Sequence, residues 1–158
     1  MLEVRPPRSI DEVARLVELW VKLMDDPEAS YLRFVLDDEA KQRWIDYMVK
    51  AYMEDPESIL LAEDEGVIVG FIASRSYDPP LKLKGFDRYA AITDLYVLPE
   101  YRGRGIGRML MERCLSRLKS RGFTKVRLSV WVGNRKAIRL YRSLGFKPRV
   151  IVMEKDLE

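Results

Sequence analysis

The chain has 158 residues, of which 47% are apolar and 34% charged, a composition typical of a folded domain rather than of a disordered segment. This length suits one compact domain, so we expect residues 1–158 to form a single domain. No stretch approaches the roughly 20 apolar residues of a membrane span, and the N-terminus lacks the apolar core of a secretory signal. The one cysteine, Cys114, has no partner for an internal disulfide. These features exclude a membrane partner and favour a cytoplasmic protein.

The small net charge of +3 hides a strong asymmetry along the chain. Residues 1–98 carry 12 Lys/Arg against 20 Asp/Glu, a balance of −8, whereas residues 99–158 carry 16 against 5, a balance of +11. Solvated helix faces are the ordinary interpretation of such charge. The functional interpretation is that the basic half meets a polyanion, either a nucleic acid or a phosphorylated cofactor. A nucleic-acid-binding domain ranks last, because no basic-helix or aromatic-sheet motif is present.

Apolar periodicity and turn signals divide the chain into alternating elements. Ser9 and either Asp37 or Asp38 are N-caps for the first two helices, and Gly66 ends the turn of a hairpin. The predicted elements are a strand over 2–5, a helix over 10–24, a helix from Asp37 or Asp38 to Asp55, strands over 58–63, 67–77 and 89–98, a helix over 105–121, a strand over 125–131, a helix over 135–144 and a strand over 149–155. This order, β-α-α-β-β-β-α-β-α-β, predicts an α/β domain with a mixed sheet and helices on its faces.

The loop that joins the predicted strand over 89–98 to the next helix is rich in glycine and arginine. Its relevant residues are Arg102, Gly103, Arg104, Gly105, Ile106, Gly107 and Arg108. The first turn of a helix has unpaired N–H donors and a positive dipole end. Glycines let these amides approach an anion closely, and arginines add charge-assisted contacts. The loop therefore predicts a pyrophosphate site, the alternative being an ordinary glycine-rich turn with surface arginines.

Two common nucleotide-binding motifs do not fit this loop. A Rossmann G-x-G-x-x-G motif counted from Gly103 needs its third glycine where Arg108 stands, and counted from Gly105 where Leu110 stands. A P-loop needs Gly-Lys-Ser/Thr, which the sequence lacks.

The pattern Arg102-x-x-Gly105-x-Gly107 resembles the cofactor-binding motif of the GNAT superfamily of acetyl-CoA-dependent N-acetyltransferases. The likeness continues in the segment from Asn134 to Phe146. It implies a single α/β domain with a mixed, mostly antiparallel sheet, and acetyl-CoA as cosubstrate with no metal. It also implies transfer of the acetyl group to a primary amine of a small molecule, peptide or protein, by direct attack in a ternary complex. A non-catalytic acetyl-CoA-binding regulatory module is the alternative, and the resemblance leaves a homodimer open.

The resemblance also implies roles for particular residues. The backbone of residues 95–97 pairs with the pantetheine arm as an added strand would, and the amides of residues 103–108 hold the pyrophosphate. The cofactor-binding residues implied are Leu95, Tyr96, Val97, Arg102, Gly103, Arg104, Gly105, Ile106, Gly107, Arg108, Asn134, Ala137 and Tyr141. Asn134 is equally well placed to act as a helix N-cap. Tyr141 matches the position whose hydroxyl protonates the departing sulfur, the alternative being a core aromatic.

The general base is left open by the sequence. There is no histidine, and Thr93 stands where many relatives have glutamate. Asp94 is adjacent, but strand alternation sends its side chain to the opposite face unless a β-bulge intervenes. We hypothesise proton removal through ordered water, ending at Asp94 or at another carboxylate.

Two further groups have structural interpretations. Cys114 lies on the apolar face of a predicted helix, which favours a buried structural thiol over a nucleophile. Five aromatics of the N-terminal helical region are expected mainly in the core, with one or two contacting the acceptor: Trp20, Tyr31, Trp44, Tyr47 and Tyr52.

Overall fold

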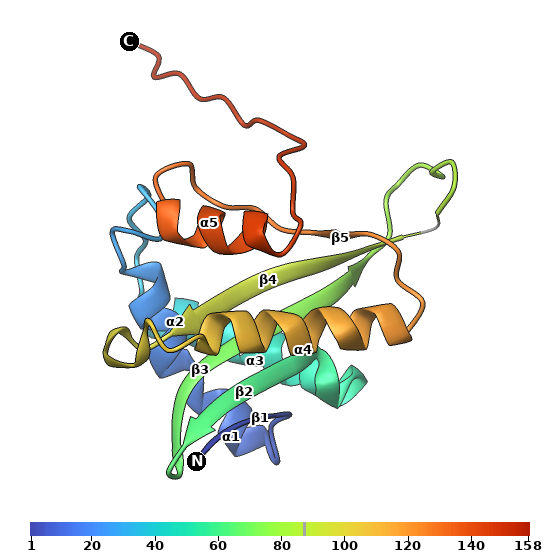
Figure 1. Cartoon of the computed structure of the whole chain (residues 1–158). Coiled ribbons are helices and arrows are strands. Elements are labelled where there is room, and N and C mark those ends of the chain that lie inside the picture. The colour runs from blue at the N-terminus through green and yellow to red at the C-terminus, as the bar shows by residue number, and fades with distance from the viewer. Residues whose placement is uncertain (87) are drawn as a thin grey trace.

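The computed structural model describes residues 1–86 and 88–158 and is built around one five-stranded sheet (Figure 1). The strands are β1 (Leu2–Arg5), β2 (Ile59–Asp64), β3 (Val67–Tyr77), β4 (Tyr89–Val97) and β5 (Val126–Arg127). They lie in chain order, β1-β2-β3-β4-β5. The first three pairings are antiparallel, and β4 pairs with β5 in parallel. The predicted fold class, a mixed and mostly antiparallel sheet with helices on its faces, is confirmed.

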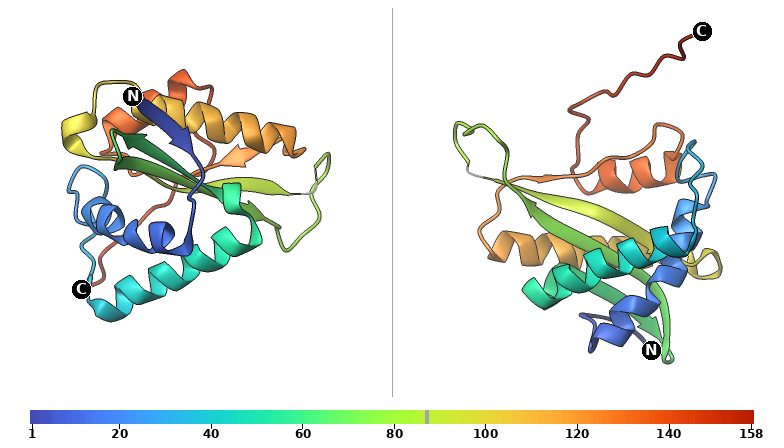
Figure 2. Two further views of the ribbon diagram at one scale, coloured as in Figure 1. Left: turned by 90° about the horizontal axis from the view of Figure 1, so that it is seen from below. Right: turned by 180° about the vertical axis from the view of Figure 1, so that it is seen from behind.

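Helices cover both faces of the sheet (Figure 2). They are α1 (Ile10–Arg15), α2 (Val17–Met24), α3 (Asp38–Glu54), α4 (Ile106–Ser120) and α5 (Arg135–Ser143), with short 3-10 turns at Pro56–Ser58 and Pro99–Tyr101. The helices α1, α2 and α3 lie on one face and α4 on the other. No helix of the described residues is long and apolar enough to cross a membrane.

The core follows the alternation of β3. Phe71 faces α3, where Trp44 meets its ring edge-on at 6.0 Å between centroids. Trp20 stacks on Trp44 at 5.2 Å, and the Tyr52 hydroxyl donates to the Pro7 carbonyl at 3.3 Å. These three aromatics of the N-terminal helices therefore serve packing, as the sequence favoured for most of the five.

Capping residues set the helix starts as predicted. The Ser9 hydroxyl accepts from the Glu12 amide, and the Asp37 carboxylate accepts from the Ala40 amide, so Asp37 and not Asp38 caps α3. The predicted helix over 10–24 is interrupted at Leu16, which is both the C-cap of α1 and the N-cap of α2.

The C-terminal strands differ from the prediction. The strand expected over 125–131 is paired only at Val126 and Arg127. The strand expected over 149–155 does not form, and residues 147–158 contain no helix or strand. Both segments are rich in strand-forming residues, but a strand needs a partner, and sequence preference does not supply one. The last element of the predicted order is therefore wrong for this chain.

Ion pairs join regions that are distant in the sequence. Arg5 of β1 donates to Glu12 of α1 at 2.6 Å and also to Glu63 of β2. The Arg5 hydrogen bond lowers the pKa of Glu12 to about 2. Arg117 of α4 pairs with Asp55 and with Glu57 at 3.2 Å. Part of the charge asymmetry between the two halves is thus neutralised inside the fold.

Candidate active site

The glycine-rich loop connects the end of β4 to α4 in a conformation that two of its glycines make available. Gly103 has φ +77° and Gly105 has φ +78°, in the left-handed region that side chains disfavour. A Cβ at either position would have open space around it, so the requirement is conformational and not steric. Gly107 has no such dihedral, and a Cβ there would lie 3.6 Å from Leu140 of α5.

The first turn of α4 presents unpaired backbone donors. Gly105 is the N-cap and offers no side chain, and the first turn holds no acidic residue. The Met109 amide is the first to reach the Gly105 carbonyl, at 3.0 Å. The amides of Ile106, Gly107 and Arg108 therefore have no acceptor within the helix, an arrangement that suits an anion.

The three arginines of the loop are bound differently. Arg102 donates from Nε to the Val97 carbonyl at 2.8 Å and lies 3.5 Å from the Asp26 carboxylate, so it ties the loop to β4 and to the segment that follows α2. Arg108 pairs with Glu112 at 3.5 Å and with the Ser143 hydroxyl. Arg104 is exposed and forms no ion pair among the described residues. Its guanidinium donates to the Glu100 carbonyl at 3.4 Å and lies 5.2 Å from the centre of the Tyr101 ring, and this positive charge suits an incoming phosphate.

The edge of β4 beside β5 is free over most of its length. β5 pairs with β4 only at Ala90 and Ala91, so residues 92–97 have no strand partner on that side in the described structure. The predicted pairing partners Leu95, Tyr96 and Val97 lie in this free stretch. Tyr96 pairs with Phe71 of β3 and is buried on the same face of the sheet as Phe71.

A β-bulge in β4 lies directly before Asp94. Ala73 of β3 pairs with Asp94, and the next β3 residue, Ser74, pairs with Ile92, so Thr93 is the extra residue of β4. Asp94 follows Tyr96 in regular alternation and lies with Ala73 on the α3 face, whereas the bulge turns Ile92 to the opposite face, together with Ser74. In this position Asp94 is a candidate base.

Burial and hydrogen bonding act in opposite directions on this carboxyl. Burial raises the pKa of Asp94, while the Thr93 hydroxyl and the positive charge of Arg75 lower it. The Thr93 Oγ1 lies 3.1 Å from Asp94 Oδ2. Because the net direction is upward, the carboxyl titrates closer to neutral pH than an exposed aspartate does.

Arg75 is a site residue that sequence reasoning missed. It follows Phe71 and Ala73 at period 2 on the α3 face, and its guanidinium lies 3.7 Å from the centre of the exposed Tyr47 ring. Its Nε is buried without a hydrogen-bond partner among the described residues. The sequence did contain a signal for it: Arg75 is a charged residue that continues the alternating, buried series of Phe71 and Ala73.

The residues of α5 fit two of the expected roles. The Asn134 side chain accepts from the Ala137 amide at 3.2 Å, so the N-cap interpretation holds. Burial raises the pKa of Tyr141, which keeps its hydroxyl protonated at neutral pH. The Tyr141 ring packs 5.9 Å from Phe146 and belongs to the edge of the core. Tyr141 therefore lies at the edge of the core and keeps a neutral, protonated phenol.

Cys114 is buried in α4, and burial raises the pKa of its thiol while the nearby Ser74 side chain lowers it. These features fit the structural thiol that the sequence favoured. No group of three or more His, Cys, Asp or Glu side chains suited to a metal occurs among the described residues.

Comparisons with known proteins place this chain among acetyltransferases. A model of the Acetyltransferase (GNAT) family matches residues 18–146. An uncharacterized N-acetyltransferase of Methanocaldococcus jannaschii is 29% identical over 90% of this chain and 59% of its own length. The mycothiol acetyltransferase of Thermobispora bispora is 41% identical over 58% of this chain and 30% of its own length. A predicted acetyltransferase of Clostridium acetobutylicum, solved with acetyl-CoA, has a TM-score of 0.73 at 21% identity, over 99% of this chain and 96% of that one.

The family match covers most of the chain, so the chain belongs to the Acetyltransferase (GNAT) family. The resemblance is confirmed, and so is acetyl-CoA as the cosubstrate at the level of the family. The chain spans 59% and 30% of the length of these two curated relatives.

Proposed function

We propose that this chain is an N-acetyltransferase that moves the acetyl group of acetyl-CoA to a primary amine of a small molecule, peptide or protein, by direct attack in a ternary complex. The observation that carries the proposal is the joint placement of the α4 anion loop, the free edge of β4 and the bulged Asp94. These features supply a cosubstrate site and a proton acceptor in one strand–loop–helix unit.

The chain's own groups fit acetyl-CoA. The unpaired amides of Ile106, Gly107 and Arg108 and the guanidinium of Arg104 suit the pyrophosphate, and the unpaired edge of residues 95–97 suits the amides of the pantetheine arm. Bound there, acetyl-CoA supplies an activated acetyl thioester. Arg102 holds the Val97 carbonyl, so that carbonyl is shared between the loop and any arm that pairs with β4.

Asp94 is assigned proton removal from the amine, directly or through water. The amine nitrogen attacks only when neutral, and in forming the amide bond to the acetyl carbon it loses one further proton. A carboxyl with a raised pKa holds such a proton better than an exposed one does. In this proposal Asp94, next to the bulged Thr93, takes the role of the glutamate that many relatives have at the position of Thr93.

Tyr141 is assigned protonation of the sulfur as the carbon–sulfur bond breaks. A thiol of pKa near 8.5 leaves more readily with a proton, and the buried phenol of Tyr141 carries one throughout the neutral range. The Leu95 or Val97 amide is assigned the developing negative charge on the acetyl oxygen.

The test is a thiol-release screen with acetyl-CoA against polyamines, amino sugars, amino acids and peptides, combined with calorimetry of coenzyme A binding. Amine-dependent thiol release, with the acetylated amine identified by mass spectrometry, supports the proposal. Coenzyme A binding without release for any amine class identifies the non-catalytic binding module instead. Failure to bind coenzyme A at all contradicts both.

A further inference from the structure

The α3 face of the sheet holds a guanidinium close to the proposed base. Ala73 and Arg75 follow each other on this face of β3, and Ala73 pairs with Asp94 of β4. Arg75 therefore lies diagonally across from Asp94, a position at which Cα atoms are roughly 7–8 Å apart and long side chains still reach each other. The positive charge of Arg75 acts on Asp94, since it lowers the pKa of that carboxyl against the effect of burial. A cation and a carboxyl thus share one site.

The Arg75 guanidinium is held in place, but its hydrogen-bond donors are poorly used. Its Cζ atom lies 3.7 Å from the centre of the Tyr47 ring, so the guanidinium lies over the ring face and its N–H groups point outward in its own plane. Nη2 has the Met48 sulfur at 3.8 Å, a weak acceptor. Nε is buried without a hydrogen-bond partner among the described residues. The geometry of this planar fork matches a carboxylate.

Other arginines of the chain show what such a side chain ordinarily does. Three further arginines of the described structure are at least half-buried, and each of them pairs with a carboxylate: Arg5 with Glu12, Arg108 with Glu112 and Arg117 with Asp55. Arg75 is the exception among the described residues. Because a withdrawn charge is costly without a partner, we expect a carboxylate from another molecule to complete this site.

Asp94 does not supply that carboxylate. No ion pair or hydrogen bond joins Arg75 to Asp94 among the described contacts, and the Asp94 carboxylate accepts from the Thr93 hydroxyl at 3.1 Å instead. Opposite charges that share a site without meeting leave room for a molecule that pairs with both. Such a molecule presents an amine to Asp94 and a carboxylate to Arg75.

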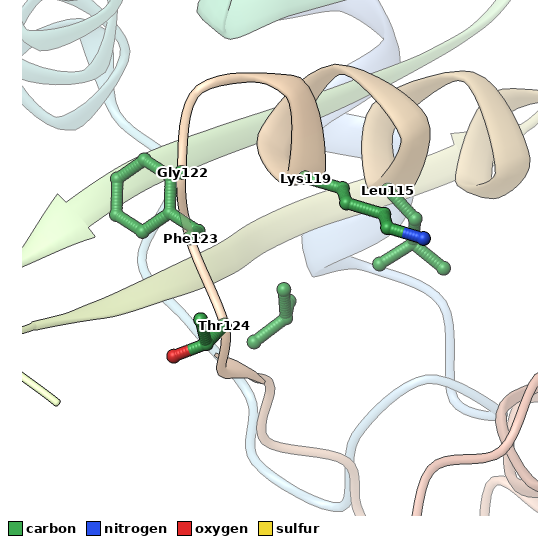
Figure 3. Close-up of a pocket in the computed structure, with 6 residues that line it drawn as sticks. Leu115, Lys119, Gly122, Phe123 and Thr124 are labelled. Atoms are coloured by element: carbon green, nitrogen blue, oxygen red, sulfur yellow. The ribbon is translucent and has the colours of Figure 1, made fainter. Parts of the chain in front are cut away.

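A hollow on the other face of the sheet lacks this combination. Leu115 and Lys119 of α4 line it together with the segment that leads into β5 (Figure 3). Lys119 is the one charged residue among its described lining residues, so none of them takes a proton from an amine at neutral pH. The two charges that an acceptor needs come together on the α3 face.

We propose that Arg75 binds a carboxylate of the acceptor while Asp94 receives its amine, so that the acceptors are small amino acids rather than polyamines or neutral amines. The inference rests on the acetyl transfer proposed above and names its acceptor class. The amine nitrogen bonds to the acetyl carbon, its proton passes to Asp94, and coenzyme A leaves as the thiol. The acceptor's carboxylate is unchanged, and its two-point contact with the Arg75 fork orients the amine.

The test compares each amino acid with its own amide. The acceptors are glycine, β-alanine, γ-aminobutyric acid, ε-aminohexanoic acid, leucine and phenylalanine, each beside the corresponding amide, and the readout is thiol release from acetyl-CoA. The ratio of kcat/KM for acid over amide is measured in the wild type and in Arg75→Met. Dividing the first ratio by the second cancels the different basicity of the amines. We expect a quotient of about 10–100 for at least one acceptor, the usual worth of a charge-assisted contact.

Two further variants complete the series. Arg75→Lys keeps the charge but not the fork, so it should lose only part of the preference for acids. It also provides a readout if Arg75→Met does not fold, since a severalfold fall in the acid-over-amide ratio is then expected. The matched control is Arg43→Gln, which removes an exposed guanidinium from α3 and should leave the ratio unchanged.

A purely electrostatic role of Arg75 gives a different result. If Arg75 acts only through the charge on Asp94, Arg75→Met raises the pKa of Asp94, moves the rise of kcat/KM to higher pH and affects acids and amides equally. A quotient of one for every acceptor would therefore overturn carboxylate recognition.

A binding measurement separates this inference from the proposed function. The same acids and amides are titrated by calorimetry into wild type and Arg75→Met saturated with coenzyme A. Tighter binding of acids that is lost in Arg75→Met, without thiol release for any amine, would support the carboxylate site and contradict acetyl transfer. Acetylation that does not distinguish acids from amides in either protein would contradict the carboxylate site and leave acetyl transfer intact. If neither binding nor turnover favours an acid, the inference is wrong.

Discussion

The loop at residues 102–108 and the bulge at residues 93–94 are neighbours in the chain but owe their geometry to different constraints. The loop takes its shape from its own residues, since Gly103 and Gly105 supply the left-handed dihedrals. The bulge takes its shape from pairing with β3, where Ala73 meets Asp94 and Ser74 meets Ile92. A change of one loop residue should therefore act locally, while the direction of Asp94 depends on the register of two strands.

This difference assigns separate functions to the two parts. The loop contributes unpaired amides and the exposed Arg104, which suit binding. The bulge contributes a carboxyl with a raised pKa on the α3 face, which suits proton transfer. Substitutions in the loop should change the affinity for coenzyme A, and substitutions at the bulge should change the rate and its pH dependence.

The largest expected effect is that of Asp94→Asn. The amide cannot accept the amine proton, so kcat/KM should fall by about 10²–10⁴, the usual contribution of a general base. The affinity for coenzyme A should stay within about twofold of the wild type, because Asp94 has no described contact with the loop. Stopped assays of thiol release and calorimetry measure the two quantities.

The matched control is Asp46→Asn, which makes the same change on an exposed position of α3 and should leave both quantities unaltered. The kcat/KM of the wild type should rise with pH as Asp94 loses its proton, and this rise should disappear in Asp94→Asn. An unchanged pH profile in Asp94→Asn would exclude Asp94 as the base. It would also contradict the assignment of proton transfer to the bulge and of cosubstrate binding to the loop.

The next largest effect is expected for Arg104→Glu. Reversing this exposed charge should weaken coenzyme A binding by about tenfold to a hundredfold, because charge-assisted contacts contribute roughly 1.5–3 kcal/mol. At saturating acetyl-CoA, kcat should change little. The effect should shrink as ionic strength rises.

Arg113→Glu is the control for that measurement. It reverses a charge on the exposed face of α4, well after the first turn, and should leave the affinity for coenzyme A nearly unchanged. Equal losses in the two variants would mean that overall charge, and not the loop, attracts the cosubstrate.

The same contrast explains what could be predicted from the sequence. Glycine spacing and capping residues report local conformational needs. The sequence therefore predicted the loop and the cap Ser9, and it narrowed the second cap to Asp37 or Asp38. Strand alternation also gave the sheet as far as β4. The break at Leu16 was not readable, because the apolar spacing continues across it.

What the sequence could not supply was the identity of a strand's neighbour. The bulge at Thr93 depends on β3, and nothing in the residues around Asp94 encodes it. The strands expected over 125–131 and 149–155 have suitable residues but lack a partner over most or all of their length in this chain. Arg75 was overlooked for a related reason, since its position beside Tyr47 follows from the packing of α3 against the sheet.

The smallest and most specific effect is expected for Thr93→Val, which keeps the shape of the side chain and removes its hydroxyl. The hydroxyl now lowers the pKa of Asp94 by hydrogen bonding, so its loss should raise that pKa further. Because the base works only when deprotonated, the rise of kcat/KM with pH should move to higher pH. The rate should therefore fall a few-fold on the acidic side of the profile and stay unchanged on its alkaline plateau.

Thr93→Ser, which keeps the hydroxyl, should follow the wild-type profile. A shift to lower pH, or an equal loss at every pH, would show that Thr93 acts through the shape of the bulge and not through the proton on Asp94.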